Sequence, residues 1–233
     1  MGISILIHHH LGLGDHLVCN GLVRELTRQS GAEIACLIVA HNNYSSVRKM
    51  YLDEPRICCV TPGNYDFSYH DAENYLNDNM HFDSVYHITT KGGRSDWDAC
   101  FYECAGVPFE KRWSAFKCYR DPGREDELLR LINPDGVPFV LVHEECSNVH
   151  YNINLNRNRL KVVKVSKLMD CNGQQFDITD WCKAIERASQ VHCVDSSFIH
   201  LCCSIRGTGV YHDFHRAGWS FSLPPGWSTS CHA

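Results

Sequence analysis

The sequence lacks several features that mark specialised classes of protein. No apolar run approaches the roughly 18 residues that a membrane-spanning helix needs, so we expect no transmembrane segment. The first residues carry neither a basic start nor a small-residue cleavage site, so we expect no secretory signal and a cytoplasmic protein. The net charge of −5 gives no reason to propose nucleic acid as a partner.

Cysteine is plentiful, but its spacing lacks the pairs that structural zinc sites use. The sequence has 14 cysteines and nowhere two of them separated by two residues, so we expect no metal site of this kind. Many lie in apolar stretches, where a free thiol packs as a small hydrophobic side chain; examples are Cys36, Cys58, Cys193 and Cys202. We expect reduced, buried thiols, with Cys231 near the polar C-terminus as the exposed one.

The N-terminal stretch has the pattern of a strand followed by a helix. An apolar run over residues 5–7 leads into three histidines and breaks at Gly12 and Gly14. From His16, apolar residues recur at helical spacing as far as residues 30–31. Residues 33–40 are nearly continuous apolar sequence, which is typical of a parallel strand covered on both faces. We therefore predict a right-handed βαβ unit at the start of the chain.

The turn at Gly12 and Gly14 indicates a ligand at the carboxyl end of the first strand. Such turns bring backbone N–H groups and a helix N-terminus up to an anionic or sugar-bearing molecule, and Asp15 is the first side chain there able to do acid–base work. Leu17 stands where a dinucleotide fingerprint has its third glycine, and no acidic residue ends the second strand. A nicotinamide or flavin oxidoreductase is therefore the weaker functional alternative. The simplest interpretation is that the two glycines only form a tight turn and bind no ligand.

The same alternation of strands and helices continues along the chain. We predict helices over residues 42–53, 71–80, 95–104, 125–132, 176–190 and 198–205, and strands over 56–60, 83–88, 138–143, 160–165 and 191–194. A polar stretch over residues 120–127 separates two α/β cycles. We predict an N-terminal domain over residues 1–120 and a C-terminal domain over 121–233.

A second candidate site lies where the late strand 191–194 meets the helix after it. Asp195-Ser196-Ser197 is a helix-capping cluster, and taken alone it needs no other role. Hydroxyls beside the free N–H groups of a helix also suit a phosphate. Because both halves of the chain offer a helix start at a strand end, we predict a cleft that holds a nucleoside diphosphate and its attached group.

Two motifs together resemble a known family. Gly-Leu-Gly-Asp-His over residues 12–16 and Asp-Ser-Ser-Phe-Ile-His-Leu over residues 195–201 look like the motifs of metal-independent GT-B glycosyltransferases, in particular the heptosyltransferase-like family 9. In that family a Gly-Asp pair follows the first strand, and an Asp-Ser-(Gly or Ser)-x-x-His-Leu string follows a late strand of the second domain. The resemblance implies an α/β fold with two Rossmann-like parallel-sheet domains facing a central cleft.

The resemblance also implies roles for individual residues. Asp15 matches the family's general base, which takes a proton from the acceptor hydroxyl. The residues expected around the donor and its diphosphate are Gly12, Gly14, His16, His143, Glu144, Arg159, Lys164, Asp195, Ser196, Ser197 and His200. Arg159 and Lys164 belong to a local basic run with Arg157 and Lys161. Alternation along a strand lets only some of these side chains reach a phosphate, and a solvated sheet edge is the default explanation for the rest.

The implied reaction moves a sugar from a nucleoside diphosphate donor to a glycan hydroxyl. We expect UDP or GDP as the nucleotide, a deoxyhexose such as rhamnose as the sugar, and inversion, since one positioned base is enough. No cofactor or metal ion is expected. The nearest Asp-x-Asp pair, Asp96-Trp97-Asp98, lies at a predicted helix start, where its two carboxylates point about 200° apart.

The sequence also departs from the family in two places. The basic residue expected after the second domain's first strand is absent from Glu144-Glu145-Cys146-Ser147, and Leu223-Pro224-Pro225-Gly226-Trp227 cannot form the long helix with which family members end. The short chain favours a minimal enzyme or a domain of a longer polypeptide. A module that binds a nucleotide sugar or glycan without catalysis therefore remains an alternative.

Overall fold

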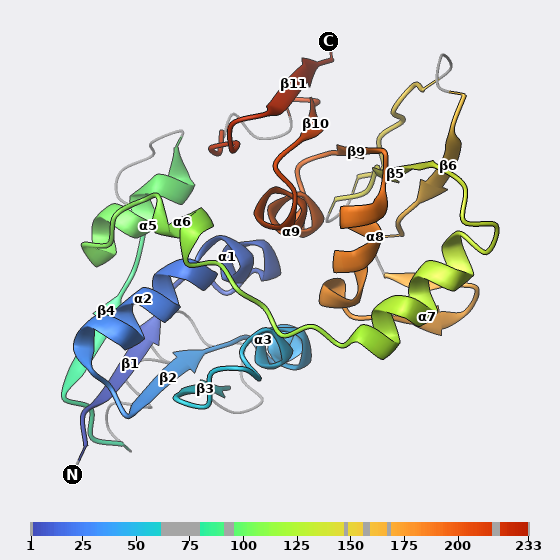
Figure 1. Ribbon diagram of the computed structural model, residues 1–233. Helices are drawn as coiled ribbons and strands as arrows, with labels where there is room; N and C mark the ends of the chain where they lie inside the picture. The colour runs from blue at the N-terminus through green and yellow to red at the C-terminus, as the bar shows by residue number, and fades with distance from the viewer. Residues whose placement is uncertain are drawn as a thin grey trace. The chain divides into compact units, whose positions relative to one another are not determined.

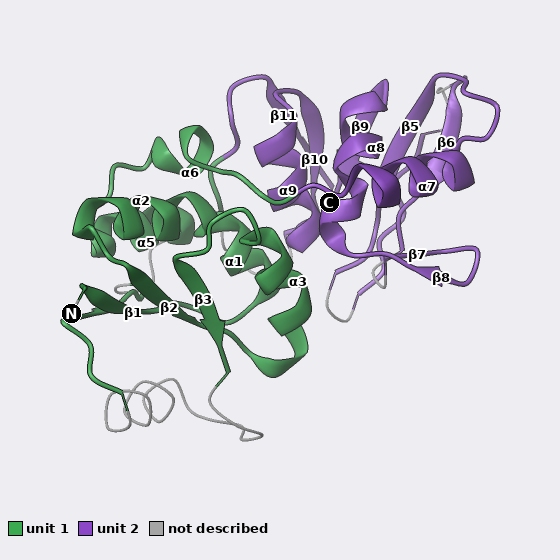
Figure 2. Ribbon diagram, turned by 60° about the horizontal axis from the view of Figure 1, so that its bottom comes forward, with its two compact units in different colours: residues 1–119, 220–222 green, residues 120–219, 223–233 purple. Residues whose placement is uncertain are grey.

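The computed structural model describes residues 2–61, 80–90, 96–146, 149–155, 159–166, 169–215 and 220–232. The chain divides into two compact units, coloured separately in Figure 2: unit 1 comprises residues 1–119 and 220–222, and unit 2 comprises residues 120–219 and 223–233. Within the described ranges, every helix is too short or too polar to cross a membrane.

Unit 1 is built on a four-stranded parallel sheet (Figure 1). Its strands are β1 (Ser4–His8), β2 (Ile34–Ile38), β3 (Ile57–Val60) and β4 (Ser84–His87), in the order β3-β2-β1-β4. The apolar run predicted as the first strand is the buried centre of this sheet, with Ile5, Leu6 and Ile7 fully buried. Its continuous apolar pattern follows from this position, because a central parallel strand is covered on both faces.

Helices and 3-10 turns of unit 1 connect and cover these strands. They are α1 (Leu13–Val18), α2 (Asn20–Ser30), η1 (His41–Asn43), α3 (Tyr44–Met50), α5 (Trp97–Ala105) and α6 (Lys111–Ser114). The predicted helix from His16 begins earlier and breaks at Cys19, where the hydroxyl of Tyr102 donates a hydrogen bond to the carbonyl oxygen of Val18 (2.8 Å). It ends as predicted, because Gly31 adopts a left-handed φ of 67°.

Unit 2 contains a five-stranded sheet that is also entirely parallel (Figure 1). Its strands are β5 (Phe139–His143), β6 (Lys161–Lys164), β9 (Gln190–Cys193), β10 (Gly209–Asp213) and β11 (Trp227–Cys231), in the order β11-β10-β9-β5-β6. The helical elements are α7 (Pro122–Ile132), η2 (Ile178–Trp181), α8 (Cys182–Arg187) and α9 (Ser197–Ile205). A small antiparallel hairpin is formed by β7 (Asp170–Cys171) and β8 (Gln174–Gln175).

The structure differs from the sequence-based expectations in several elements. The helix predicted from residue 125 begins earlier, at Pro122, inside the polar stretch predicted as the domain boundary. The Asp121 carboxylate accepts hydrogen bonds from the N–H groups of Gly123 (3.0 Å) and Arg124 (3.1 Å), and Pro122 fits the first helical position. Strands β10 and β11 were not predicted. Cys58 is exposed on β3 and was wrongly expected to be buried, whereas Cys231 is exposed as expected. Most of the predicted helix 71–80 lies outside the described residues.

A short C-terminal segment belongs to unit 1, which the sequence did not indicate. Ser220 pairs with Asp96 in a parallel bridge, and the N–H group of Ser222 donates to Oδ2 of Asp98 (2.7 Å). Asp98 is fully buried and also pairs with the buried guanidinium of Arg112. The carboxylate of Asp98 is therefore engaged in holding unit 1 together.

Candidate functional site

Most of the residues predicted from the sequence, with the exception of Arg159, follow strands at the points where each parallel sheet reverses its strand order. In unit 1 the order reverses between β1 and β4, and in unit 2 it reverses between β5 and β9. Ligands of open α/β sheets bind outside the carboxyl ends of the strands at such a switch point. The loop after β1 leads to Asp15, the chain after β5 carries Glu144, and the chain after β9 carries Ser196.

The Asp15 carboxylate lies at the start of α1 and is partly exposed. Its side chain is 18% exposed, and its Oδ2 lies 3.0 Å from Nδ1 of His10. This hydrogen bond raises the pKa of His10 above its ordinary value of 6.5. Gly12 makes room for the carboxylate, because a Cβ atom at that position would lie 2.5 Å from Oδ2. Gly14 lies half-buried in the same first turn.

Two residues that sequence reasoning missed keep this loop in place. The side-chain amide of Asn43 donates to the carbonyl oxygen of Leu11 (2.8 Å), which joins η1 to the loop after β1. His10 itself was passed over as one of three consecutive histidines. A polar side chain five residues before Asp15, across a glycine turn, was the signal that pointed to it.

His9 and His16 lie behind the Asp15 loop in the protein interior. The side chain of His16 is fully buried, and its ring meets the ring of His9 edge to face at a centroid distance of 4.5 Å. Burial lowers the pKa of His16 well below its ordinary value and that of His9 to about 4, so both rings are neutral at pH 7. Neither ring nitrogen of His16 has a hydrogen-bond partner among the described residues.

The junction between β9 and α9 presents two hydroxyls at a helix start. Ser196 is the N-cap residue, with an extended backbone, and its hydroxyl donates to the carbonyl oxygen of Val194 (3.3 Å). Asp195, Ser196 and Ser197 are all partly exposed. The helix behind them is buried from Phe198 to Cys203, which includes His200 at 3% exposure. The first N–H groups of α9 have no intrahelical partners, so they are suited to an anion.

The carboxyl end of β5 is occupied by buried, mutually paired groups. Nδ1 of His143 lies 3.0 Å from the carbonyl oxygen of Val165, and burial lowers the pKa of His143. Oε1 of Glu144 accepts a hydrogen bond from the N–H group of Ile153 (2.7 Å), and Oε2 lies 2.6 Å from Nζ of Lys164. Lys164 is therefore the counter-charge of a carboxylate that is only 3% exposed.

Arg159 lies apart from the other predicted donor residues. It is exposed and precedes the amino end of β6, whereas Lys164 ends that strand. The two residues therefore lie near opposite ends of β6, which runs parallel to β5. Five residues, at about 3.3 Å each, separate them along the strand. Arg157, from the same basic run, lies outside the described residues.

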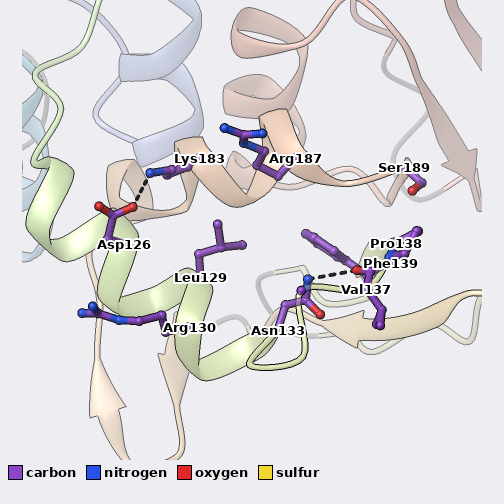
Figure 3. Close-up of a pocket in the computed structure, with 11 residues that line it drawn as sticks. Asp126, Leu129, Arg130, Asn133, Val137, Pro138, Phe139, Lys183, Arg187 and Ser189 are labelled. Carbon is purple, nitrogen blue, oxygen red and sulfur yellow. Dashed lines mark hydrogen bonds and ion pairs between the residues drawn. The ribbon is translucent and has the colours of Figure 1, made fainter.

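The larger of two cavities described in unit 2 lies at the amino end of β5 and contains none of the predicted site residues. It has a volume of about 660 Å³, and Figure 3 shows it between α7, α8 and the chain entering β5. Asp126 and Lys183 form an ion pair across it, and Arg130 and Arg187 also line it. A smaller cavity of about 310 Å³ includes His192 and Arg206.

Comparison with known proteins gives a match at the level of the fold. No protein-family model and no curated protein sequence matches the chain. Among solved structures, the family 9 glycosyltransferase of Veillonella parvula DSM 2008 superposes with a TM-score of 0.65 at 10% identity, covering 99% of this chain and 86% of that one. The chain has the fold of the family 9 glycosyltransferases.

Two further structures carry the same family 9 fold. Heptosyltransferase II of Escherichia coli matches with a TM-score of 0.56 at 9% identity, over 99% of this chain and 90% of that one. The iron-containing dodecameric glycosyltransferase TibC of enterotoxigenic E. coli H10407 matches with a TM-score of 0.62 at 11% identity, over 97% of this chain and 62% of TibC. These matches confirm the fold that the motifs at residues 12–16 and 195–201 implied.

Proposed function

We propose that this chain is a glycosyltransferase that moves a sugar from a nucleoside diphosphate to a hydroxyl of a glycan, with inversion and without a catalytic metal ion. One observation carries the proposal: the Asp15 loop and the Ser196 junction each occupy a switch point in a fold shared with family 9 glycosyltransferases. We assign the acceptor and the base to residues 1–120 and the donor to residues 121–233.

Asp15 is the proposed general base. Its partly exposed carboxylate accepts the proton of the acceptor hydroxyl as that oxygen forms a bond to the anomeric carbon. The bond between the anomeric carbon and the donor phosphate oxygen breaks, and the electron pair leaves with the nucleoside diphosphate. His10 donates its hydrogen bond to Oδ2 and so orients the carboxylate, leaving Oδ1 to the substrate.

The start of α9 is the proposed site of the departing diphosphate. Its free N–H groups, the helix dipole, and the hydroxyls of Ser196 and Ser197 stabilise the charge that develops on the leaving oxygen. Asp195 has the same sign of charge as the phosphates, so we assign it to a hydroxyl of the donor. The buried His16, His143 and His200 support the loops from behind.

The nucleotides to be tested as part of the donor come from the sequence and from the solved neighbours. The sequence-based expectation is UDP or GDP with a deoxyhexose. Solved neighbours include E. coli heptosyltransferase WaaC with ADP, and TibC with ADP-D-β-D-heptose, so ADP sugars belong beside them. Because Lys164 pairs with the buried carboxylate of Glu144, we assign the helix start as the principal anion site near β5 and β9.

Thermal unfolding against ADP, UDP, GDP, CMP and NAD is the first test. A nucleotide at a hundred times its dissociation constant adds about 2.7 kcal/mol of apparent stability. We expect one nucleoside diphosphate to stabilise the chain. Stabilisation by NAD alone would discard the transferase in favour of an oxidoreductase.

Release of that nucleoside diphosphate from its sugar conjugate, measured with glycan acceptors in the presence of EDTA, is the second test. We expect Asp15→Asn to bind the nucleotide normally and to lose turnover by roughly 10²–10⁴-fold. Asp135→Asn, at an exposed turn of unit 2, is the matched control and should be fully active. Binding without turnover in the unaltered chain would instead identify a non-catalytic binding module.

A further inference from the structure

Three different metal-binding side chains meet at the outer edge of the unit 2 sheet. Asp213 ends β10, Cys231 ends the edge strand β11, and His215 follows Asp213 by two residues. One carboxylate oxygen, one imidazole nitrogen and one sulfur atom lie within 4.8 Å of one another. None of the three takes part in the proposed transfer.

The strand register explains why these groups converge. Asp213 and Cys231 are direct partners in the parallel pairing of β10 with β11, so their side chains project from the same face of the sheet. Neighbouring strands lie about 4.8 Å apart, so two paired side chains on one face can direct their ligand atoms toward one ion. The chain then turns at His215, whose Nδ1 lies 3.5 Å from Oδ2 of Asp213.

The Asp213 carboxylate is oriented for a ligand on one oxygen. Oδ1 accepts hydrogen bonds from the N–H group of His215 (2.8 Å) and the hydroxyl of Tyr211 (3.4 Å). Oδ2 faces the imidazole of His215. Hydrogen bonds that fix a ligating carboxylate in this way are typical outer-shell support for a metal ion.

The opposite face of the same strands is held by a chain of histidines. Nδ1 of His192 lies 2.9 Å from Nε2 of His212, and Nδ1 of His212 lies 2.8 Å from Nε2 of His232. Phe214 stacks on His232 with a centroid distance of 4.2 Å. His212 precedes Asp213 and His232 follows Cys231. The hydrogen-bonded histidines therefore hold the two strand ends in the positions that bring the three ligand groups together.

The donor set selects the metal. Thiolate and imidazole are poor ligands for Mg²⁺ and Ca²⁺, which prefer oxygen. A mixed set of sulfur, nitrogen and oxygen suits Zn²⁺, and three protein ligands with a water molecule in the fourth tetrahedral position are the pattern of open zinc sites. His215 is 65% exposed and Asp213 is 28% exposed, so solvent reaches the fourth position.

We propose that Asp213, His215 and Cys231 bind one Zn²⁺ ion, with water as the fourth ligand, and that this ion cross-links the ends of β10 and β11. The ion fastens the exposed edge strand to the sheet, and it is separate from the chemistry assigned to Asp15.

The test uses the full chain, stripped of metal with a chelator, kept reduced and titrated with Co²⁺ as a spectroscopic substitute for Zn²⁺. We expect one equivalent to bind with a thiolate-to-cobalt charge-transfer band in the near ultraviolet, and Zn²⁺ to displace it and raise the Tm. Cys231→Ser should abolish the band, while Asp213→Asn and His215→Gln should each weaken Zn²⁺ binding by about tenfold or more.

Cys58→Ser is the matched control, because Cys58 is an exposed thiol on β3 of unit 1. It should keep the band, the stoichiometry and the Zn²⁺-induced rise in Tm. A band that survives in Cys231→Ser, Zn²⁺ affinity that is equal in all variants, or the absence of saturable binding each overturns the proposal. These readouts do not involve sugar transfer, so their outcome is independent of whether the proposed function is correct.

Discussion

Nδ1 of His10 lies 3.0 Å from Oδ2 of Asp15, so a histidine in the loop after β1 holds the carboxylate that we assign as general base. Both residues belong to the same glycine-containing loop and helix start, which makes the pair independent of how the rest of the chain is arranged. Substitutions of His10, or of Gly12 beside the carboxylate, therefore test the site directly.

The His10 pair predicts a pH-dependent contribution to stability. Because Asp15 raises the pKa of His10, the folded state binds this proton more tightly than the unfolded state. The stabilisation is fully present below about pH 6.5 and is lost as the pH rises through the raised pKa. His10→Gln should therefore cost up to about 1 kcal/mol at pH 5.5, a small value because the ring is 57% exposed, and almost nothing at pH 8.5.

Denaturant unfolding of His10→Gln at the two pH values measures this difference. His41→Gln, which changes an exposed histidine of η1, is the control and should show the same small cost at both. An effect of His10→Gln that grows with pH would contradict the assignment.

Gly12→Ala should displace the Asp15 carboxylate and so reduce turnover more than stability. The backbone of Gly12 (φ −67°, ψ 147°) is open to alanine, so the new contact 2.5 Å from Oδ2 is the main effect. We expect turnover to fall roughly 10- to 100-fold, since small misplacements of a reacting group are costly, and stability to fall by about 1 kcal/mol. Gly207→Ala, where a Cβ meets nothing within 4 Å, should leave turnover unchanged.

Lys164→Gln should affect stability more than donor binding. It leaves the buried Glu144 carboxylate without its cation, and we expect a loss of about 1–2 kcal/mol, discounted because Lys164 is 64% exposed. Lys161→Gln on the same strand should change stability by less than about 0.5 kcal/mol. A raised KM for the donor in Lys164→Gln, with an unchanged Tm, would show instead that Lys164 contacts the donor.

Asp98→Asn should be the most destabilising of these substitutions. The guanidinium of Arg112 is 1% exposed and would lose its counter-charge, which typically costs about 3–5 kcal/mol. Asp135→Asn, at an exposed position, is expected to change stability by less than about 0.5 kcal/mol. Equal Tm values for the two variants would show that the buried pair contributes nothing.

Much of the fold could be predicted because its central strands carry their own signal. The strands β1, β2, β5 and β9 are short apolar runs, and α2 and α9 start or end at glycine or serine residues whose conformations are local properties. Strands β10 and β11 were missed because both are mixed in polarity and only partly buried. The start of α7 was missed because its capping residue, Asp121, stands in a stretch with few apolar side chains.

The sequence by itself determined the alternation of strands and helices and the two motifs at strand ends, because hydrophobic period and capping residues act over a few neighbouring positions. Only the tertiary structure decided that His143, Glu144 and Lys164 are buried or paired, that Asp98 meets Arg112, and that Asp213 meets Cys231. Those relationships depend on strand order, register and burial. Strand order, register and burial bring together residues that are distant along the chain, and no local sequence pattern predicts such contacts.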